Sequence, residues 1–249
     1  MNEISRLFDA RAEAYASFRP QYPDSLFAWL AGHCRERRRV LDLACGNGQA
    51  SRSLPRHFDQ VLACDASIGQ LRAAGDIPGV SLYAASAEAQ PLPDACLDVL
   101  VVAQALHWFA SPAFFREVAR LLKPGGLFCA WCYSLMRIDD ELDPLIDAFY
   151  HVTLKGYWPA GRASVDAGYR DIQLPLARIE PPTFTIEAHW TFAQLTGYLR
   201  TWSAVQRRER QQGRDPVLEL TPALRRAWGD SELPRPIRWP LHLLAGTAN

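Results

Sequence analysis

Short apolar runs alternate with helical stretches between residues 40 and 133, and this alternation limits the possible folds of the chain more than any other feature. A run of about five apolar residues has the length of a strand. The run at 97–105 is almost entirely apolar, which is typical of a strand covered on both faces. Strand–helix alternation of this kind predicts a parallel, doubly wound sheet. We expect strands at 40–44, 60–64, 80–84, 97–105, 127–133, 184–190 and 237–246, with helices at 49–57, 67–74 and 112–122.

The segments that flank this core carry weaker patterns. Residues 1–34 show helical spacing that Pro20 and Pro23 interrupt, and we expect them to form a helical lid within the same domain as 35–249. After residue 134 we expect helices at 139–153, 192–211 and 223–228 as C-terminal embellishments. The predicted fold is therefore a Rossmann-like α/β domain with a seven-stranded, mostly parallel, doubly wound sheet.

The charge balance excludes a generally basic binder. The 27 basic residues, 25 of them Arg, face 27 acidic ones, so bulk attraction to nucleic acid or to an anionic membrane is not expected. No apolar run reaches the roughly 18 residues of a membrane helix. The polar N-terminus has no signal-peptide pattern, and most of the six cysteines lie in strand-like runs, which favours the cytoplasm.

A metal or redox role for the cysteines is not expected either. Cys129 and Cys132 form a C-x-x-C pair, but on a strand they would point to opposite faces of the sheet. No second pair is present to complete a zinc site. We therefore predict no metal.

The residues with the most specific spacing follow the first strand. Gly46 and Gly48 form a tight turn that lets a ligand approach the backbone, and such turns lie where open parallel sheets bind ligands. Seventeen residues beyond Gly48, the second strand ends in Asp65, whose carboxylate can accept hydrogen bonds from both hydroxyls of a ribose. This series predicts a nucleoside-containing cofactor.

Charge then distinguishes between cofactors. The dinucleotide pattern needs a third glycine where this chain has Ser51, and Asp42 beside the loop would repel a pyrophosphate. An acid there suits a cationic ligand, and S-adenosylmethionine carries both an ammonium and a sulfonium group but no phosphate. Asp42 could also be a buried structural hydrogen-bonding group. An NAD-type oxidoreductase is the alternative from another enzyme class.

The same segments resemble the class I S-adenosylmethionine-dependent methyltransferases of the broad "methyltransferase type 11" group. The resemblance runs in order through VLDLACGNG, Cys64-Asp65, ASAEAQPLPDACLD (85–98), VAQALHWF (102–109) and EVARLLKPGGLF (117–128). Residues 15–23, with Tyr15, Arg19 and Tyr22, resemble an N-terminal element of a subgroup that includes trans-aconitate methyltransferases, and residues 198–210 resemble its C-terminal region.

The resemblance implies a set of cofactor-binding residues. Tyr15 and Arg19 would approach the methionine carboxylate, Asp65 would hold the ribose, and Ala87 would read the adenine edge. Two departures are Ala44 in place of the first glycine and Ser86 where an acid often accepts from the adenine amino group. The full cofactor set is Tyr15, Arg19, Asp42, Ala44, Gly46, Gly48, Asp65, Ala66, Ser67, Ser86, Ala87, Glu88, Gln104 and Ala105.

The acceptor side is less specific. His107 is the candidate general base, because an imidazole titrates near neutral pH. Alternatively, His107 only forms part of the pocket wall. Trp108, Tyr133, Arg200 and Trp202 would line the acceptor pocket, although core packing is the usual role of a tryptophan. The motif after the fourth strand, Gln-Ala-Leu-His, is not the N-P-P-Y type of amide or base N-methylation.

We therefore expect a methyltransferase that O-methylates a carboxylate or hydroxyl of a small molecule, as a monomer or homodimer that binds no nucleic acid or membrane. The second alternative is an RNA-associated methyltransferase that uses the arginine clusters at 35–39 and 207–214, although 207–214 also fits a solvated helix face.

Overall fold

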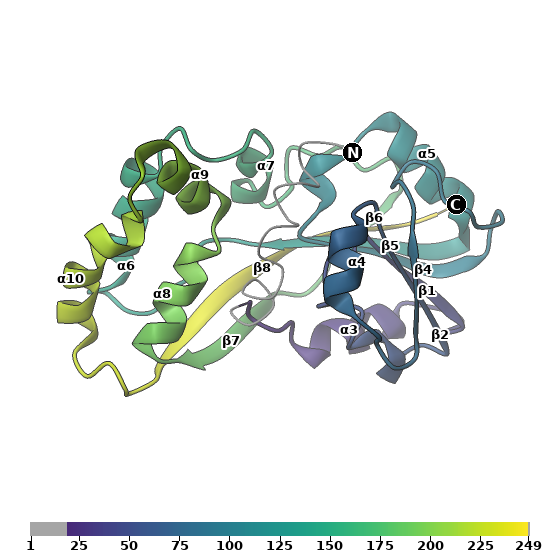
Figure 1. The fold of residues 1–249 in the computed structure, drawn as a ribbon. Helices are drawn as coiled ribbons and strands as arrows, with labels where there is room; N and C mark the ends of the chain where they lie inside the picture. The colour runs from purple at the N-terminus through teal and green to yellow at the C-terminus, as the bar shows by residue number, and fades with distance from the viewer. Residues whose placement is uncertain (1–18, 249) are drawn as a thin grey trace.

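The computed structural model describes residues 19–248, which form an eight-stranded sheet with helices on both faces (Figure 1). Four neighbouring pairs, β3–β2, β2–β1, β1–β4 and β4–β5, are parallel, and β8 pairs antiparallel with β5, β6 and β7. Along the sheet the order is β3-β2-β1-β4-β5-β8-β6, with β7 also bonded to β8. The strands are β1 (Arg39–Leu43), β2 (Gln60–Asp65), β3 (Val80–Ala84), β4 (Leu97–Ala103), β5 (Leu122–Tyr133), β6 (Ala177–Ile179), β7 (Phe184–Trp190) and β8 (Arg235–Thr247).

The doubly wound, mostly parallel architecture predicted from the alternation is confirmed. The predicted number of strands was one too low, because β6 has only three residues and no apolar run marks it. The strand order places β1 between β2 and β4, so the chain proceeds in opposite directions across the sheet from that point. In such sheets the ligand crevice lies at the carboxyl ends of the two strands where the order reverses.

The two faces of the sheet have separate apolar cores. Helix α3 (Asp24–Gly32) packs Leu26, Phe27 and Leu30 on the face that contains Trp131. Helix α5 (Pro112–Leu121) packs Phe114 and other apolar side chains on the opposite face. Residues alternate between faces along a strand, and Cys129 and Cys132 accordingly belong to different cores. All six cysteines are free thiols.

The predicted lid falls mostly outside the described residues, which begin at Arg19. Within 1–34, only α3 is described as a helix, and its apolar side chains belong to the core of the sheet domain. Helix α3 ends at Gly32, so the basic cluster 35–39 is not the end of a helix; Arg39 instead begins β1.

The predicted helix at 49–57 is wrong. The segment forms consecutive turns that end in the short 3-10 helix η1 (Leu54–Arg56). Its backbone hydrogen bonds do not keep one sequence separation. Arg52 N donates to Gly48 O, four residues back, at 3.1 Å, whereas Ser53 N donates to Ala50 O, three residues back, at 3.0 Å. Pro55 lacks an N–H and cannot continue a regular ladder. The predicted helices at 67–74 and 112–122 correspond to α4 (Ile68–Ala74) and α5.

The C-terminal half adds further helices, most of them on the left of Figure 1, with α7 (Arg162–Asp166) nearer the middle. The predicted helix at 192–211 is two helices, because the Thr201 hydroxyl donates to the Tyr198 carbonyl at 2.6 Å and Trp202 adopts an extended conformation. The predicted helix at 223–228 begins earlier, at Pro216. The elements are α6 (Asp143–Ala148), the π-helical turn η3 (Phe149–Thr153), α7 (Arg162–Asp166), α8 (Phe192–Arg200), α9 (Ser203–Gln212) and α10 (Pro216–Trp228).

Within residues 19–248, none of these helices combines the length and apolar character needed to cross a membrane.

Candidate cofactor and acceptor site

A cavity of about 450 Å³ opens at the carboxyl ends of β1 and β4, where the strand order reverses. This volume is within the usual range of small-molecule sites. The residues that directly follow the two strands, Ala44 and Gln104, both have φ of 57°. Positive φ is costly for residues with a Cβ and often occurs at functional sites. Both strained residues line the cavity, so the crevice is shaped by the ends of β1 and β4.

The glycine loop needs its two glycines for different reasons. Gly46 has φ of 58° and lines the cavity. Gly48 has φ of 80°, and a Cβ added there would lie 2.3 Å from Ile77 Cδ1. Gly46 therefore leaves backbone open to a ligand, whereas Gly48 allows the loop to pack against the protein. Gly48 itself does not line the cavity.

Asp65 is held rigidly at the end of β2. One carboxylate oxygen accepts from Gly46 N at 2.8 Å, and the other accepts from Ser67 N at 2.8 Å. Ser67 in turn caps α4, because its hydroxyl accepts from Gln70 N at 3.2 Å. A carboxylate oxygen has more than one lone pair, so an anchored Asp65 can still accept hydrogen bonds from a ligand.

A loop on the other side of Asp65 carries Ser86, Ala87 and Glu88, all of which line the cavity. Its conformation is fixed from α5, because Arg120 donates to the Leu92 carbonyl at 2.8 Å and to the Gln90 carbonyl at 3.2 Å. The Ser86 hydroxyl donates to Glu88 at 2.5 Å. The acid that the family often has at position 86 is therefore replaced by a serine bonded to a neighbouring acid.

Asp42 lies beneath the glycine loop and outside the cavity lining. Its side chain is fully buried, and one oxygen accepts from the Ser51 hydroxyl. The other oxygen, Oδ1, bonds to no residue of 19–248. Burial raises the pKa of Asp42 to about 7. This placement fits the structural alternative, and a direct contact of Asp42 with the cofactor stays a prediction.

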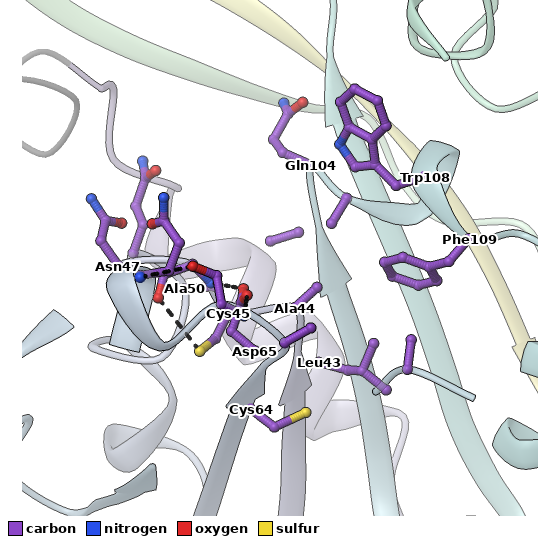
Figure 2. A pocket seen from close by; sticks show the side chains of 18 of the residues that line it. Leu43, Ala44, Cys45, Asn47, Ala50, Cys64, Asp65, Gln104, Trp108 and Phe109 are labelled. Carbon is purple, nitrogen blue, oxygen red and sulfur yellow. Dashed lines mark hydrogen bonds between the residues drawn. The ribbon is translucent and has the colours of Figure 1, made fainter. Parts of the chain in front are cut away.

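The opposite wall of the cavity, here called the β4–β5 end, consists of Gln104, Trp108, Phe109 and Tyr133. Figure 2 shows Gln104, Trp108 and Phe109 across from Cys45 and Asp65. Gln104 Nε2 is buried and donates to none of the described residues. The Tyr133 hydroxyl accepts from Arg19, whose guanidinium lies 5.5 Å from the Tyr198 ring centre. An amide donor without a partner is thus available to a ligand.

His107 is adjacent to this wall but does not line the cavity. Its Nδ1 lies 3.2 Å from the Tyr169 hydroxyl, and its ring packs on Trp108 and Tyr169. Burial, with a smaller effect of the nearby Arg162 cation, lowers the pKa of His107 to about 4. At neutral pH it is an uncharged imidazole of low basicity, and its role as general base stays a hypothesis.

The cavity brings together twelve of the predicted site residues: Ala44, Gly46, Asp65, Ala66, Ser67, Ser86, Ala87, Glu88, Gln104, Ala105, Trp108 and Tyr133. Asp42, Gly48 and His107 lie beside it. Tyr15 is outside the described residues. The three remaining predicted residues are Arg19, which donates to the lining residue Tyr133, and Arg200 and Trp202 of the C-terminal half, and their assignment stays a prediction.

Arg200 and Trp202 have their own partners in the C-terminal half. Arg200 Nε donates to Asp215, the N-cap of α10, at 2.7 Å. Trp202 is 6% exposed and packs with Phe149, Tyr150, Trp158 and Tyr198. Neither residue lines the cavity within the described part of the chain.

Sequence reasoning missed the neighbours of the motif residues. These additional lining residues lie between the predicted ones, and most belong to the motifs quoted above. Including every residue of each motif would have predicted most of them. The sequence offers less indication for Tyr22, which lies in the less specific 15–23 element, and for Gln70, which lies in no quoted motif. The additional lining residues are Tyr22, Leu43, Cys45, Asn47, Gln49, Ala50, Cys64, Gln70, Ala85, Ala103 and Phe109.

Comparison with known proteins identifies the family. Residues 41–130 match the model of a methyltransferase domain. A protein of Dictyostelium discoideum named as a methyltransferase is 30% identical over 245 residues, which cover 95% of this chain and 93% of that protein. The chain belongs to the class I S-adenosylmethionine-dependent methyltransferases.

Solved structures agree with this family. A protein of Anaeromyxobacter dehalogenans described as a type II methyltransferase is 43% identical and aligns with a TM-score of 0.87 over 92% of this chain and 98% of its own. The YcgJ protein of Bacillus subtilis aligns with a TM-score of 0.52 at 20% identity over 90% of this chain and 98% of its own, which shows a shared fold.

The cofactor of the family, S-adenosylmethionine, fits the residues present. The loop at Gly46 leaves backbone accessible, Asp65 offers acceptors of the kind that ribose hydroxyls need, and Gln104 Nε2 is a buried donor without a partner in the described chain. When bound, the cofactor supplies a methyl group attached to a positively charged sulfur. We propose that Asp65 holds the ribose, the 86–88 loop contacts the adenine, and Gln104 contacts the methionine portion.

Proposed function

We propose that this methyltransferase O-methylates a small molecule, and that the acceptor oxygen belongs to a carboxylate. The observation that carries this choice is the lack of a suitable base along the described lining of the cavity. No histidine or lysine belongs to that lining, and His107 lies outside it. A hydroxyl or an amine must lose a proton during methylation, whereas a carboxylate is already ionised at neutral pH.

The ionisable side chains that do line the cavity support the same conclusion. Burial raises the pKa of the Cys64 thiol to about 11, and it raises the pKa values of Cys45 and Tyr133 further above their usual range, so all three keep their protons. Asp65 and Glu88 lie at the end of the cavity proposed for ribose and adenine. The rate enhancement would then come from holding the acceptor oxygen in line with the methyl group and excluding water.

The experiment is a methyl-transfer assay with S-adenosylmethionine that carries a labelled methyl group. The purified protein is incubated with a panel of small carboxylic acids, alcohols, phenols and amines, and the products are treated with mild base. A carboxyl methyl ester releases labelled methanol under these conditions, whereas ethers and N-methyl products keep the label. We expect base-labile label with at least one acid.

Label that resists base would show a hydroxyl or amine acceptor and contradict the proposal. Incubation with cellular RNA, followed by nuclease digestion, tests the RNA alternative in the same assay. Label recovered in nucleotides would favour that alternative. Calorimetry with S-adenosylhomocysteine, the demethylated product of the cofactor, confirms that the protein used in the assay is competent to bind.

A further inference from the structure

Arg162 was not singled out from the sequence, and it does not itself line the cavity, but it is near enough to the lining residue Tyr133 to favour the ionised form of that side chain. Its neighbour Gly161 packs so closely on the segment after β4 that a Cβ would be 2.9 Å from His107 Cδ2 and 3.0 Å from the His107 carbonyl oxygen. At the other end of α7, the Val165 carbonyl accepts from the thiol of Cys132, the residue before Tyr133, at 3.7 Å. Helix α7 is therefore fixed between the ends of β4 and β5.

The Arg162 guanidinium is held on one edge only. Its Cζ lies 4.8 Å from the Trp158 ring centre and 5.0 Å from the Tyr150 ring centre, so the cation packs against a pair of rings whose centres are 4.4 Å apart. Nε donates to the Tyr150 hydroxyl and to Asp166 at 3.0 Å. These contacts orient the side chain, which is 24% exposed.

The other edge of the guanidinium is unused within the described chain. The two terminal nitrogens, Nη1 and Nη2, donate no hydrogen bond to any residue of 19–248. Asp166 is the one acid in an ion pair with Arg162 among these residues, and it also accepts from the Tyr150 hydroxyl at 2.6 Å. Asp166 therefore bonds to Nε and to Tyr150, and the N–H groups of Nη1 and Nη2 remain as a parallel pair of donors. Such a pair binds a carboxylate in a bidentate manner.

A second cation approaches the same region. Arg19 donates to the Tyr133 hydroxyl and lies over the Tyr198 ring. Arg162 and Arg19 both act on Tyr133, since each favours the ionised phenolate, although burial raises the pKa of Tyr133 overall. Two arginines and several aromatic rings therefore lie near Tyr133, an arrangement suited to an organic anion.

We propose that Arg162 binds a carboxylate of the methyl acceptor through Nη1 and Nη2, which makes it the residue that selects organic acids. This proposal rests on the proposed function, because it assigns a substrate class to the same site. The competing explanation is structural: Arg162 could serve only to join Tyr150, Trp158 and Asp166. That role uses the stacking and Nε contacts and leaves the terminal nitrogens without a purpose.

The test compares Arg162→Gln, Arg162→Lys and the control Arg170→Gln, whose target is an exposed arginine in the segment after α7. Each protein is saturated with S-adenosylhomocysteine and titrated in a calorimeter with benzoate, phenylacetate, indole-3-acetate, succinate and glutarate, and with the corresponding amides. We expect the unchanged protein and Arg170→Gln to bind at least one acid in preference to its amide. Arg162→Gln should weaken binding of that acid roughly 10- to 100-fold and abolish the preference.

Arg162→Lys separates the two explanations. Lysine keeps the cation but loses the pair of parallel donors, so affinity for the acid should fall while affinity for S-adenosylhomocysteine and the melting temperature stay near their original values. If Arg162→Gln does not fold, the acid-to-amide preference of Arg162→Lys decides. Equal affinity for the acid in Arg162→Lys and in the unchanged protein would overturn the proposal, as would an unchanged protein that binds no acid better than its amide.

The two proposals can fail separately. Base-stable labelled products would reject carboxylate methylation, while the calorimetric preference still measures the role of Arg162. Conversely, base-labile products whose KM is the same in Arg162→Gln and the unchanged protein would leave carboxylate methylation in place and remove Arg162 from acceptor binding.

Discussion

The two halves of the molecule differ in how their functional groups are positioned. Up to Tyr133, the groups that face the cavity are held by backbone contacts at strand ends, as when Asp65 accepts from Gly46 N and Ser67 N at 2.8 Å each. Beyond Tyr133, the positions depend on side chains that pack on one another, as when Arg162 stacks on Trp158 and Tyr150. Backbone geometry thus positions the groups of the cofactor half, the chain up to Tyr133, whereas side-chain packing positions Arg162 in the acceptor half, where we propose that the acceptor binds.

The comparisons with known proteins parallel this difference. The methyltransferase domain model matches 41–130, which is the cofactor half only. The Dictyostelium discoideum protein and the Anaeromyxobacter dehalogenans structure extend the similarity over most of the chain. The experiments below test whether the cofactor half depends on backbone geometry and the acceptor half on packing.

Replacement of Asp65 should give the largest effect. We expect Asp65→Ala to weaken S-adenosylhomocysteine binding roughly 100-fold, from two hydrogen bonds to a charged group at about 1.5 kcal/mol each. Calorimetry measures the affinity, and Asp59→Ala, at an exposed acid before β2, is the matched control. A folded Asp65→Ala protein with unchanged affinity would refute the ribose assignment.

Gly48→Ala tests the backbone of the loop. The alanine Cβ would lie 2.3 Å from Ile77 Cδ1, and φ of 80° is unfavourable for alanine. We expect the free energy of unfolding to fall by roughly 2 to 3 kcal/mol, measured by urea denaturation. Gly32→Ala is the control, because a Cβ at Gly32 meets nothing within 4 Å. Equal stability of the two variants would show that the loop does not need a glycine at position 48.

Acid titration of two buried groups, His107 and Asp42, should change the stability of the protein in opposite directions. Between pH 4 and 6.5 the unfolded chain binds a proton at His107 that the native protein does not, because the pKa falls from 6.5 to about 4 on folding. This proton uptake by the unfolded chain lowers the free energy of unfolding as pH falls. The pKa of Asp42 rises from 3.8 to about 7, so the native protein binds the extra proton, and the stability that this proton contributes is lost as pH rises through 7.

The quantity to compare is the change in unfolding free energy from pH 7 to pH 5. We expect this change to be about 2 kcal/mol more favourable in His107→Gln than in the unchanged protein, and less favourable by a similar amount in Asp42→Asn. Urea denaturation at the two pH values, without cofactor, measures both. Parallel pH profiles for all three proteins would show that neither group titrates as described. His107→Gln also tests catalysis, since full methyl transfer by this variant would remove His107 as general base.

The smallest effect is expected at the start of α8. The Thr191 hydroxyl accepts from Gln194 N at 3.4 Å, and the Gln194 side chain accepts from Thr191 N at 2.9 Å, which together form a capping box. Thr191→Ala should reduce the unfolding free energy by about 1 kcal/mol. The exposed loop residue Thr183 provides the control Thr183→Ala. A loss in Thr191→Ala no greater than in the control would show that the cap contributes nothing measurable.

Much of the cofactor half could be predicted because its signals are local. Five strands and the positions of Gly46 and Asp65 follow from periodicity and from spacing along the chain, although β5 begins at Leu122, five residues before the predicted start. The misassigned helix at 49–57 shows the limit of such signals, because Pro55 and the turn at Gly48 prevent a regular hydrogen-bond ladder.

The acceptor half was less predictable because its decisive contacts join residues far apart in the chain. Arg19 meets Tyr133 across 114 positions, and Gly161 meets His107 through the packing of α7. Local sequence patterns cannot reveal such pairs. Arg162 has nothing in the sequence that separates it from the other 24 arginines, and Arg200, a predicted pocket residue, pairs with Asp215.

The amino-acid sequence by itself determined the doubly wound sheet, the glycine turn and the acid at the end of β2, because hydrophobic periodicity and backbone conformation are set by near neighbours. Only the tertiary structure decided which side chains meet at the β4–β5 end of the cavity. In the folded chain His107 is buried, Arg200 donates to Asp215, and the two terminal nitrogens of Arg162 donate to no residue of 19–248. Burial and pairing between distant residues set the charge and the available donors of a side chain, and these follow from the packed structure as a whole.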